Sequence, residues 1–374
     1  MNIVFICGCL EAGFDGVGDY VRSLAGELQN QGHKVVAIAI NDNHVDHRVL
    51  ELQCSHSADL QALRLPSCWT TVHRFSQAKK FIDNFNPDYI SLQFVPFSFH
   101  PKGLPISFCK QLNKVVCGRN LHIMFHELWV GMDSNSSVKH ILWGFFQKQL
   151  IKSLVRTLHP RVIHTQAPLY VFQLLKLKVL SGYLPLFSNI PPLIQPASKE
   201  INKKKIRFVI FGYIHPNSPV ELFVEEAAEY RNSTMYEISL TFLGKCGPEM
   251  EHWVKVWEAH GFFVEQLGVL TSERISNELV TATIGISTTP AVLVEKSGSV
   301  LAMLAHRLPV VLISRKMNIK GFKGKDLPSG ISEYSIGNFS KIFNEKLCSP
   351  TLDSAATVAR KMADSLIGSY NVEN

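Results

Sequence analysis

The chain has 374 residues, a length that suits two ordinary domains better than one. Hydrophobic residues make up 46% of it and charged residues 18%, so large buried cores are expected and a disordered protein is excluded. No apolar run reaches the ~18 residues of a membrane span. Residues 1–9 lack the basic leader and cleavage site of a signal peptide, which predicts a buried first strand and a cytoplasmic protein.

The net charge is +7. The basic excess lies in the first half of the chain, which has 18 lysines and arginines but only 12 aspartates and glutamates before residue 190. A basic half of this kind can attract an anionic acceptor, or it can make a peripheral contact with the anionic inner surface of a membrane. The alternative is a basic face that is simply solvated. No arginine-rich arm or zinc-finger spacing indicates a nucleic-acid partner. The eight cysteines form no CxxC pair, so free thiols and no metal site are expected. The oligomeric state stays open.

The first 190 residues alternate between strand and helix patterns. Spacing of apolar residues predicts an amphipathic helix over 17–31, which Gly32 ends, and a long helix over 138–158. Strand–helix–strand order implies a parallel sheet, so residues 1–190 are predicted to form a Rossmann-like domain. Its strands are expected at 3–6, 35–40, 89–94, 121–125 and 162–164.

Prolines and a lysine triplet mark residues 191–205 as a linker, and a second α/β domain is predicted over 206–350. The segment 351–374 carries a helical pattern over 354–367 and is expected to pack back on the first domain. The fold class is therefore α/β, with two doubly wound parallel-sheet domains and a ligand cleft between them, at the carboxyl ends of the strands. The second domain's strands are expected at 207–211, 238–243, 262–267, 284–287 and 309–313, with a helix over 299–306.

The loop between the first strand and the first helix is rich in glycine. Gly16 and Gly18, with Val17 between them, let the backbone approach a ligand at a helix N-terminus, which favours anions. Val21 stands where a dinucleotide fingerprint has its third glycine, and no Gly-Lys-Ser/Thr follows. A tight turn without a ligand is the alternative.

A histidine and a glutamate, His126 and Glu127, follow the strand at 121–125. A histidine at the carboxyl end of a strand can hydrogen-bond a sugar hydroxyl or a reacting oxygen. An HExxH zinc motif is excluded because Val130 stands where its second histidine belongs. A purely structural histidine is the alternative.

Two further segments have binding chemistry. Lys296, Ser297, Gly298 and Ser299 open a helix, where a cation, hydroxyls and free amides suit a diphosphate; helix capping by a serine is the alternative.

Residues 93–103 form an aromatic and proline-rich segment that could hold a sugar or an amphipathic acceptor; a packed loop is the alternative. Its candidate contacts are Gln93, Phe97, His100 and Lys102.

The glycine loop, the His126 loop and the Lys296 loop, in this order, resemble the retaining GT-B glycosyltransferases of family 4. The resemblance covers most of the chain and includes Gly32-His-Lys-Val35 and Pro309-Val-Val311. It implies a hexosyltransferase-type enzyme that transfers a sugar from a UDP- or GDP-sugar to an acceptor, with retention of configuration. It implies no metal and no other cofactor.

The resemblance also implies roles for residues. The first domain would bind the acceptor and the second the donor, with His126, Glu127 and Lys296 as the catalytic group. The residues 16–18 and 296–299 would hold the donor diphosphate. The nucleobase and ribose would contact Gly268, Val269, Leu270 and Glu295.

Two departures from the family pattern limit the resemblance. The family's paired glutamates would fall at Val294 and Ala302, and its Arg and Lys after the first strand of the second domain have no counterpart in residues 212–218, so Lys296 would take over their charge. A catalytically silent homologue that acts as a binding or partner subunit is therefore one alternative. A sugar-nucleotide epimerase or a dinucleotide-dependent enzyme is the other.

Overall fold

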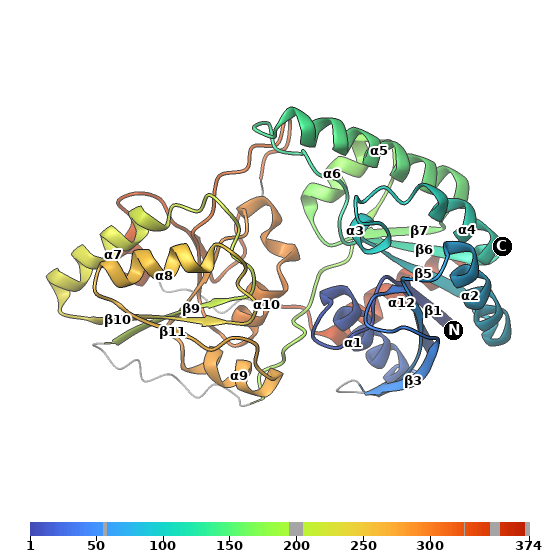
Figure 1. The fold of residues 1–374 in the computed structure, drawn as a ribbon, viewed down its shortest axis with the longest axis horizontal. Coiled ribbons are helices and arrows are strands. Elements are labelled where there is room, and N and C mark those ends of the chain that lie inside the picture. Colours follow the sequence, from blue (N-terminus) through green and yellow to red (C-terminus); the bar gives the residue numbers. More distant parts are fainter. Residues whose placement is uncertain (55–57, 194–204, 325, 345–351, 371–374) are drawn as a thin grey trace. The chain divides into compact units, whose positions relative to one another are not determined.

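The computed structural model describes residues 1–54, 58–193, 205–324, 326–344 and 352–370. The chain forms two compact units, the first from Met1–Leu186, Ile319–Phe322 and Asp353–Asn374, the second from Phe187–Asn318 and Lys323–Leu352 (Figure 1). Most of the linker expected over 191–205 lies outside the described residues.

The first unit contains an eight-stranded sheet in the order β3-β4-β2-β1-β5-β6-β7-β8. All neighbouring strands pair in parallel except β3, which pairs antiparallel with β4 at one edge. The five strands predicted for this half are confirmed, whereas the β3–β4 hairpin was not predicted. The strands are β1 (Asn2–Cys7), β2 (Lys34–Asp42), β3 (Val49–Cys54), β4 (Asp59–Pro66), β5 (Tyr89–Phe94), β6 (Asn120–Phe125), β7 (Val162–Thr165) and β8 (Gly182–Tyr183).

Helices cover both faces of this sheet. The predicted helices over 17–31 and 138–158 are α1 (Gly16–Asn30) and α5 (Val138–Leu158). The C-terminal helix α12 (Ala355–Tyr370) packs against α1, and its Leu366 carbonyl accepts a 3.1 Å hydrogen bond from the buried Tyr89 hydroxyl. The other helices of this unit are α2 (Thr71–Phe85), α3 (Pro96–Phe99), α4 (Ile106–Val116) and α6 (Pro168–Lys176).

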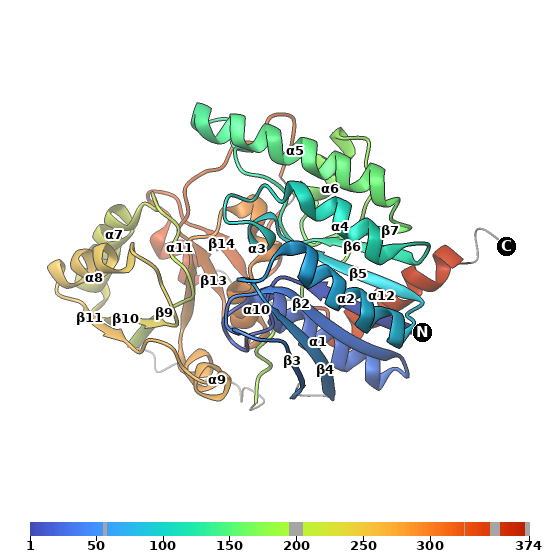
Figure 2. The same cartoon turned by 45° about the vertical axis from the view of Figure 1, so that its right-hand side comes forward.

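The second unit contains a six-stranded parallel sheet in the order β11-β10-β9-β12-β13-β14, of which Figure 2 shows β13 and β14. Its strands match the predicted ones, with β14 in addition: β9 (Lys205–Phe211), β10 (Glu237–Leu243), β11 (Phe263–Gln266), β12 (Ile284–Ser287), β13 (Val310–Leu312) and β14 (Ile331–Glu333). One face packs under α7 (Val220–Thr234), α8 (Met250–Ala259) and α11 (Phe339–Asn344). The other packs under α9 (Ser272–Thr281), the short helix η1 (Ala291–Lys296) and α10 (Gly298–Ala305).

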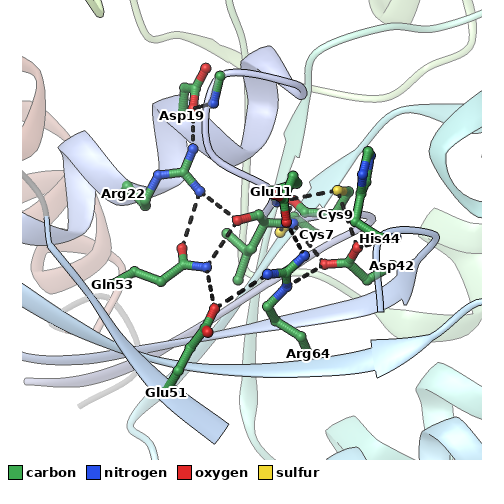
Figure 3. Close-up of polar contacts among 12 residues, drawn as sticks. Cys7, Cys9, Glu11, Asp19, Arg22, Asp42, His44, Glu51, Gln53 and Arg64 are labelled. Carbon is green, nitrogen blue, oxygen red and sulfur yellow. Dashed lines mark hydrogen bonds and ion pairs between the residues drawn. The ribbon is translucent and has the colours of Figure 1, made fainter. Parts of the chain in front are cut away.

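A buried ion pair anchors the loop that follows β1 (Figure 3). Asp42, the last residue of β2, is fully buried and accepts hydrogen bonds from Arg64 Nε at 2.8 Å and from the Leu10 amide at 3.3 Å. Arg64, in β4, also pairs with Glu11 in the loop and with Glu51 in β3. Residues from three strands thus fix the course of the chain between β1 and α1.

A second set of hydrogen bonds holds the same loop from the helix side. Arg22 of α1 donates to the Leu10 carbonyl at 2.8 Å and to Gln53 Oε1 at 3.1 Å. The amide of Gln53, in β3, donates to the same carbonyl at 3.0 Å. The otherwise exposed edge strand β3 therefore contributes to the position of the loop.

The free energy of unfolding should depend on the Asp42–Arg64 pair. Burial alone would raise the pKa of Asp42, but hydrogen bonds from Arg64 and from the His44 and Leu10 amides lower it below the ordinary 3.8. The carboxylate therefore stabilises the fold above pH 3.8, and this stabilisation is lost as the pH falls through its lowered pKa.

Arg64→Met should destabilise the protein by about 3 kcal/mol at neutral pH, because it leaves a buried carboxylate without its cation. Urea unfolding followed by circular dichroism measures this, with the exposed Arg48→Met as the matched control. A loss no larger in Arg64→Met than in Arg48→Met would contradict the anchoring role.

Candidate functional site

The glycine loop leads into the first turn of α1. The Asp15 carboxylate caps the helix by accepting the Val17 amide at 2.9 Å, and burial raises its pKa against the effect of this hydrogen bond. A Cβ atom at Gly18 would lie 2.7 Å from the Cys9 carbonyl oxygen, whereas one at Gly16 would meet open space. The close approach at Gly18 is therefore to the chain's own backbone, which gives this glycine a packing role that the sequence analysis did not anticipate.

His126 directly follows β6 and is 7% exposed. Its Nε2 lies 2.8 Å from Gln93 Oε1, its Nδ1 lies 3.0 Å from Gln166 Oε1, and the Tyr20 ring packs edge-on against it at 5.1 Å between centroids. Gln93, assigned to an acceptor loop from sequence, is instead a residue of β5 that is 1% exposed and lies beside this imidazole. Glu127, the next residue, is partly exposed.

A continuous chain of buried hydrogen bonds runs from Gln93 to the C-terminal helix. Gln93 Nε2 donates to Ser91 Oγ at 2.7 Å, and Ser91 Oγ lies 2.8 Å from His122 Nδ1. His122 Nε2 lies 3.1 Å from His164 Nδ1, and His164 Nε2 lies 3.2 Å from Ser365 Oγ of α12. Through Gln93, the orientation of His126 is thus tied to a helix far along the chain.

The two histidines in this chain are held neutral. Burial lowers the pKa of His164 from 6.5 to about 4, and burial together with the neighbouring His164 and His126 lowers the pKa of His122 well below 6.5. A neutral imidazole donates through one nitrogen and accepts through the other, which suits a chain of single hydrogen bonds.

A cavity of about 1030 Å³ opens at the carboxyl ends of β1, β2, β4 and β5. Phe97 and His100 of the predicted acceptor segment line it, together with Phe14 and His44, whose rings are tilted by 54° with their centroids 5.2 Å apart. Lys102 is exposed and is not part of the lining. The cavity belongs wholly to the first unit, and its other contributors, Arg74 above all, were not identified from sequence.

In the second unit, the predicted anion site forms at the start of α10. Ser297 is the N-cap: its Oγ accepts the Val300 amide at 3.4 Å and lies 3.2 Å from Ser299 Oγ. A Cβ atom at Gly212, which follows β9 with φ +85°, would lie 3.6 Å from Ser299 Cβ. The turn after β9 therefore approaches the helix start closely.

Lys296 directly precedes Ser297, the N-cap of this helix. Burial lowers the pKa of His215, and the positive charges of Lys296 and Arg315 lower it further. The His215 amide donates to Thr288 Oγ1 at 2.7 Å, which ties the turn after β9 to the loop after β12. Arg315 comes three residues after β13 and was missed; a cation shortly after the carboxyl end of a strand is the signal that could have identified it.

The positions of the missing glutamates are apolar core. Val294 is 2% exposed and Ala302 is 1% exposed, and both pack in the cluster beneath α9 and α10. Glu295, next to the first of them, is partly exposed in η1. A carboxylate at 294 or 302 would have no access to solvent in this packing.

The residues assigned to the nucleobase form a turn after β11. Gly268 adopts φ +65°, and its carbonyl accepts the Gly244 amide at 2.7 Å. Val269 is 68% exposed, whereas Leu270 packs against the core. The turn thus presents an exposed edge next to the end of β10.

Over the described ranges, no helix is both long and apolar enough to cross a bilayer. Within the same ranges, His, Cys, Asp and Glu side chains form no group of three that could hold a metal ion.

The comparisons with known proteins bear on the fold. No protein-family model matches the chain, and no curated protein matches it. Solved structures do: Anabaena HepE in complex with UDP and glucose shares 10% identity, a TM-score of 0.57 and coverage of 100% of this chain and 98% of that one. WaaG, a glycosyltransferase involved in lipopolysaccharide biosynthesis, shares 13% identity, a TM-score of 0.56 and coverage of 97% and 95%. A Listeria monocytogenes protein assigned as a UDP-N-acetylglucosamine 2-epimerase shares 11% identity, a TM-score of 0.59 and coverage of 100% and 97%.

At such identities the likeness concerns the fold. Two α/β units with parallel sheets, matched over nearly the full length of glycosyltransferase structures, make this the GT-B fold that the sequence predicted.

The buried histidines should make stability pH-dependent. Because the unfolded His164 takes up a proton near pH 6.5 and the folded one only near pH 4, the native state should lose up to about 3 kcal/mol as the pH falls through this window. His164→Gln should flatten the dependence of the free energy of unfolding on pH between 6.5 and 4. Urea unfolding across this range measures it, with the exposed His73→Gln as control. Parallel curves for wild type and His164→Gln would refute the assignment.

Proposed function

We propose that the protein is a glycosyltransferase of the hexosyltransferase type, which transfers a sugar from a UDP- or GDP-sugar to an acceptor with retention of configuration. The observation that carries this proposal is the capped start of α10 in the second unit, which Lys296 directly precedes and where the Ser297 and Ser299 hydroxyls lie 3.2 Å apart. Likeness of fold to HepE, which was solved with UDP and glucose, supports it.

The donor diphosphate would bind at the start of α10. Its negative charge would face Lys296, Arg315 and the amides of residues 298 and 299, with the hydroxyls of Ser297 and Ser299 as further donors. When the bond between the anomeric carbon and the diphosphate oxygen breaks, charge grows on the diphosphate. Preorganised cations and amides stabilise that charge without moving, and no metal is required for this.

The rest of the donor site would follow from the same placement. The nucleobase would contact the backbone of residues 268–270, and Glu295 would reach the ribose. On the first unit, His126 and Glu127 would contact the transferred sugar, with a sugar hydroxyl replacing Gln166 at His126 Nδ1. Residues 16–18, at the start of α1, would add donors to the diphosphate only if it displaced the Asp15 carboxylate, which accepts the Val17 amide.

Two other functions would use the same fold. The loss of the paired glutamates favours a silent homologue that binds nucleotide or a partner without turnover. The likeness to a Listeria epimerase favours an enzyme that acts on the nucleotide sugar alone. Incubation with UDP-N-acetylglucosamine without acceptor separates them, since an epimerase changes the sugar, a transferase hydrolyses the donor slowly, and a silent homologue does neither.

Titration calorimetry with UDP, GDP, dTDP, CDP, ADP and NAD tests the donor site. One nucleoside diphosphate should bind, and Lys296→Ala, Ser299→Ala and Arg315→Ala should each weaken it, the cation variants by at least about tenfold. The exposed neighbour Lys316→Ala is the matched control. The pKa of His215, followed by NMR, should rise in both cation variants because a nearby positive charge is gone.

Nucleotide affinity that is equal in Arg315→Ala, Lys296→Ala and Lys316→Ala would refute the donor site. Binding of NAD in place of a diphosphate would refute the glycosyltransferase itself.

We also propose that the protein acts in the cytoplasm and contacts the inner membrane surface through α5. This helix exposes Val138 (82%), Leu142 (58%), Phe145 (51%) and Phe146 (51%). Exposed basic residues of the same helix, Lys139, Lys152 and Arg156, would face anionic head groups. An exposed apolar strip beside basic residues is typical of helices that lie in a membrane interface.

Vesicle sedimentation tests this contact. The full chain should bind phosphatidylglycerol vesicles and not phosphatidylcholine vesicles, and the double variant Phe145→Ser/Phe146→Ser should lose most of that binding. Phe263→Ser removes an even more exposed ring (69%) from the second unit and should have no effect. Unchanged binding of the double variant would exclude α5 as the contact.

A further inference from the structure

Arg74 is a buried cation that pairs with no acidic side chain among the residues that the structure describes. It lies in the first turn of α2 and is 9% exposed. Its guanidinium donates to the Ile40 carbonyl at 2.9 Å, to the side-chain oxygen of Asn41 and to Thr71 Oγ1 at 3.3 Å, all of which are neutral acceptors. Its Nε hydrogen has no acceptor within the part of the chain that the structure describes.

Arg64, in the same unit, shows the carboxylate partners that a buried arginine usually has. Arg64 is equally buried but pairs with three carboxylates. Among the described residues no carboxylate pairs with Arg74, and burial accordingly lowers its pKa. Because a buried charge without a counterion is costly, proteins keep one where a ligand supplies the opposite charge.

Arg74 lines the cavity of about 1030 Å³. Three serines line it too: Ser67 after β4, Ser98 of α3 and Ser107 of α4. The exposed Lys110 is a further lining residue. Asp15 is the one carboxylate among the lining residues, and burial raises its pKa. A guanidinium, several hydroxyls and a second cation match the many acceptor oxygens and the double charge of a phosphate.

We propose that Arg74 binds a phosphate group of the acceptor in this cavity. The naming of the ligand as the acceptor rests on the proposed glycosyltransferase function, but the phosphate site itself does not. Phe97 and Phe99, which also line the cavity, offer apolar faces to the remainder of such a molecule.

Two sources could present this phosphate: a soluble sugar phosphate and the head group of a lipid. Calorimetric titrations of the full chain with glucose 6-phosphate and with dispersed dihexanoyl phosphatidic acid distinguish them. Glucose and dihexanoyl phosphatidylcholine are the uncharged and zwitterionic counterparts. All titrations use the Lys296→Ala background, so that the anion site of the second unit contributes little.

Arg74→Gln should weaken binding of the phosphate probe by at least about tenfold, because it removes the positive charge that pairs with the phosphate. Lys80→Gln removes an exposed positive charge from the same helix and should change the affinity by less than about twofold. Binding of both probes assigns the site to phosphate in general, and binding of phosphatidic acid alone assigns it to a lipid head group.

Arg74→Gln also removes hydrogen bonds that Arg74 makes within the fold, so a second variant that keeps them is needed. Lys110→Glu changes an exposed residue and brings a negative charge to the cavity lining, so it should weaken the same probe several-fold. If Arg74→Gln does not fold, this variant decides the matter.

Three results would overturn the proposal: no phosphate probe binds, a probe binds Arg74→Gln and Lys110→Glu as tightly as the parent, or glucuronate binds where glucose 6-phosphate does not. None of these titrations involves a nucleotide or turnover. Their failure therefore refutes the Arg74 site alone, whereas failure of UDP binding at Lys296 and Arg315 refutes the proposed function.

Discussion

The buried pair of Asp42 and Arg64 fixes the loop on which the first unit's candidate site depends. Asp42 ends a central strand, Arg64 comes from the next strand of the sheet, and together they hold the Leu10 amide and Glu11 in place. The cap of α1 and the cavity lining begin directly after this point. Such a pair adds specificity of shape more than net stability, since its charges first had to leave water.

The sequence predicted the strands well because most of them are continuous apolar runs, buried on both faces by helices. It missed the β3–β4 hairpin: β3 is an edge strand whose Leu50 and Leu52 are 46% and 67% exposed and whose pattern lacks a buried face, and β4 was missed although most of its residues are buried. The residues of the α10 start were found because they are neighbours in sequence. Arg315 follows a predicted strand and could have been found by that position. Nothing in the sequence marks His215 or Arg74, because only folding brings them to their partners.

The second unit has apolar core where the family's paired glutamates would fall. At 294 and 302 the side chains are buried and pack in the cluster beneath α9 and α10. Positive charge instead comes from Lys296 in η1 and from Arg315 after β13. The parallel sheet permits this, because the carboxyl ends of neighbouring strands all open on the same edge.

The docking of α12 on the first unit has a consequence for the order of folding. This helix buries Val358, Met362 and Leu366 and receives the hydroxyl of Tyr89. During synthesis, the core of the first unit therefore stays incomplete until the second unit has been made. The second unit can fold first although it is the later one in the chain, and the closure of the first unit becomes a late, long-range step.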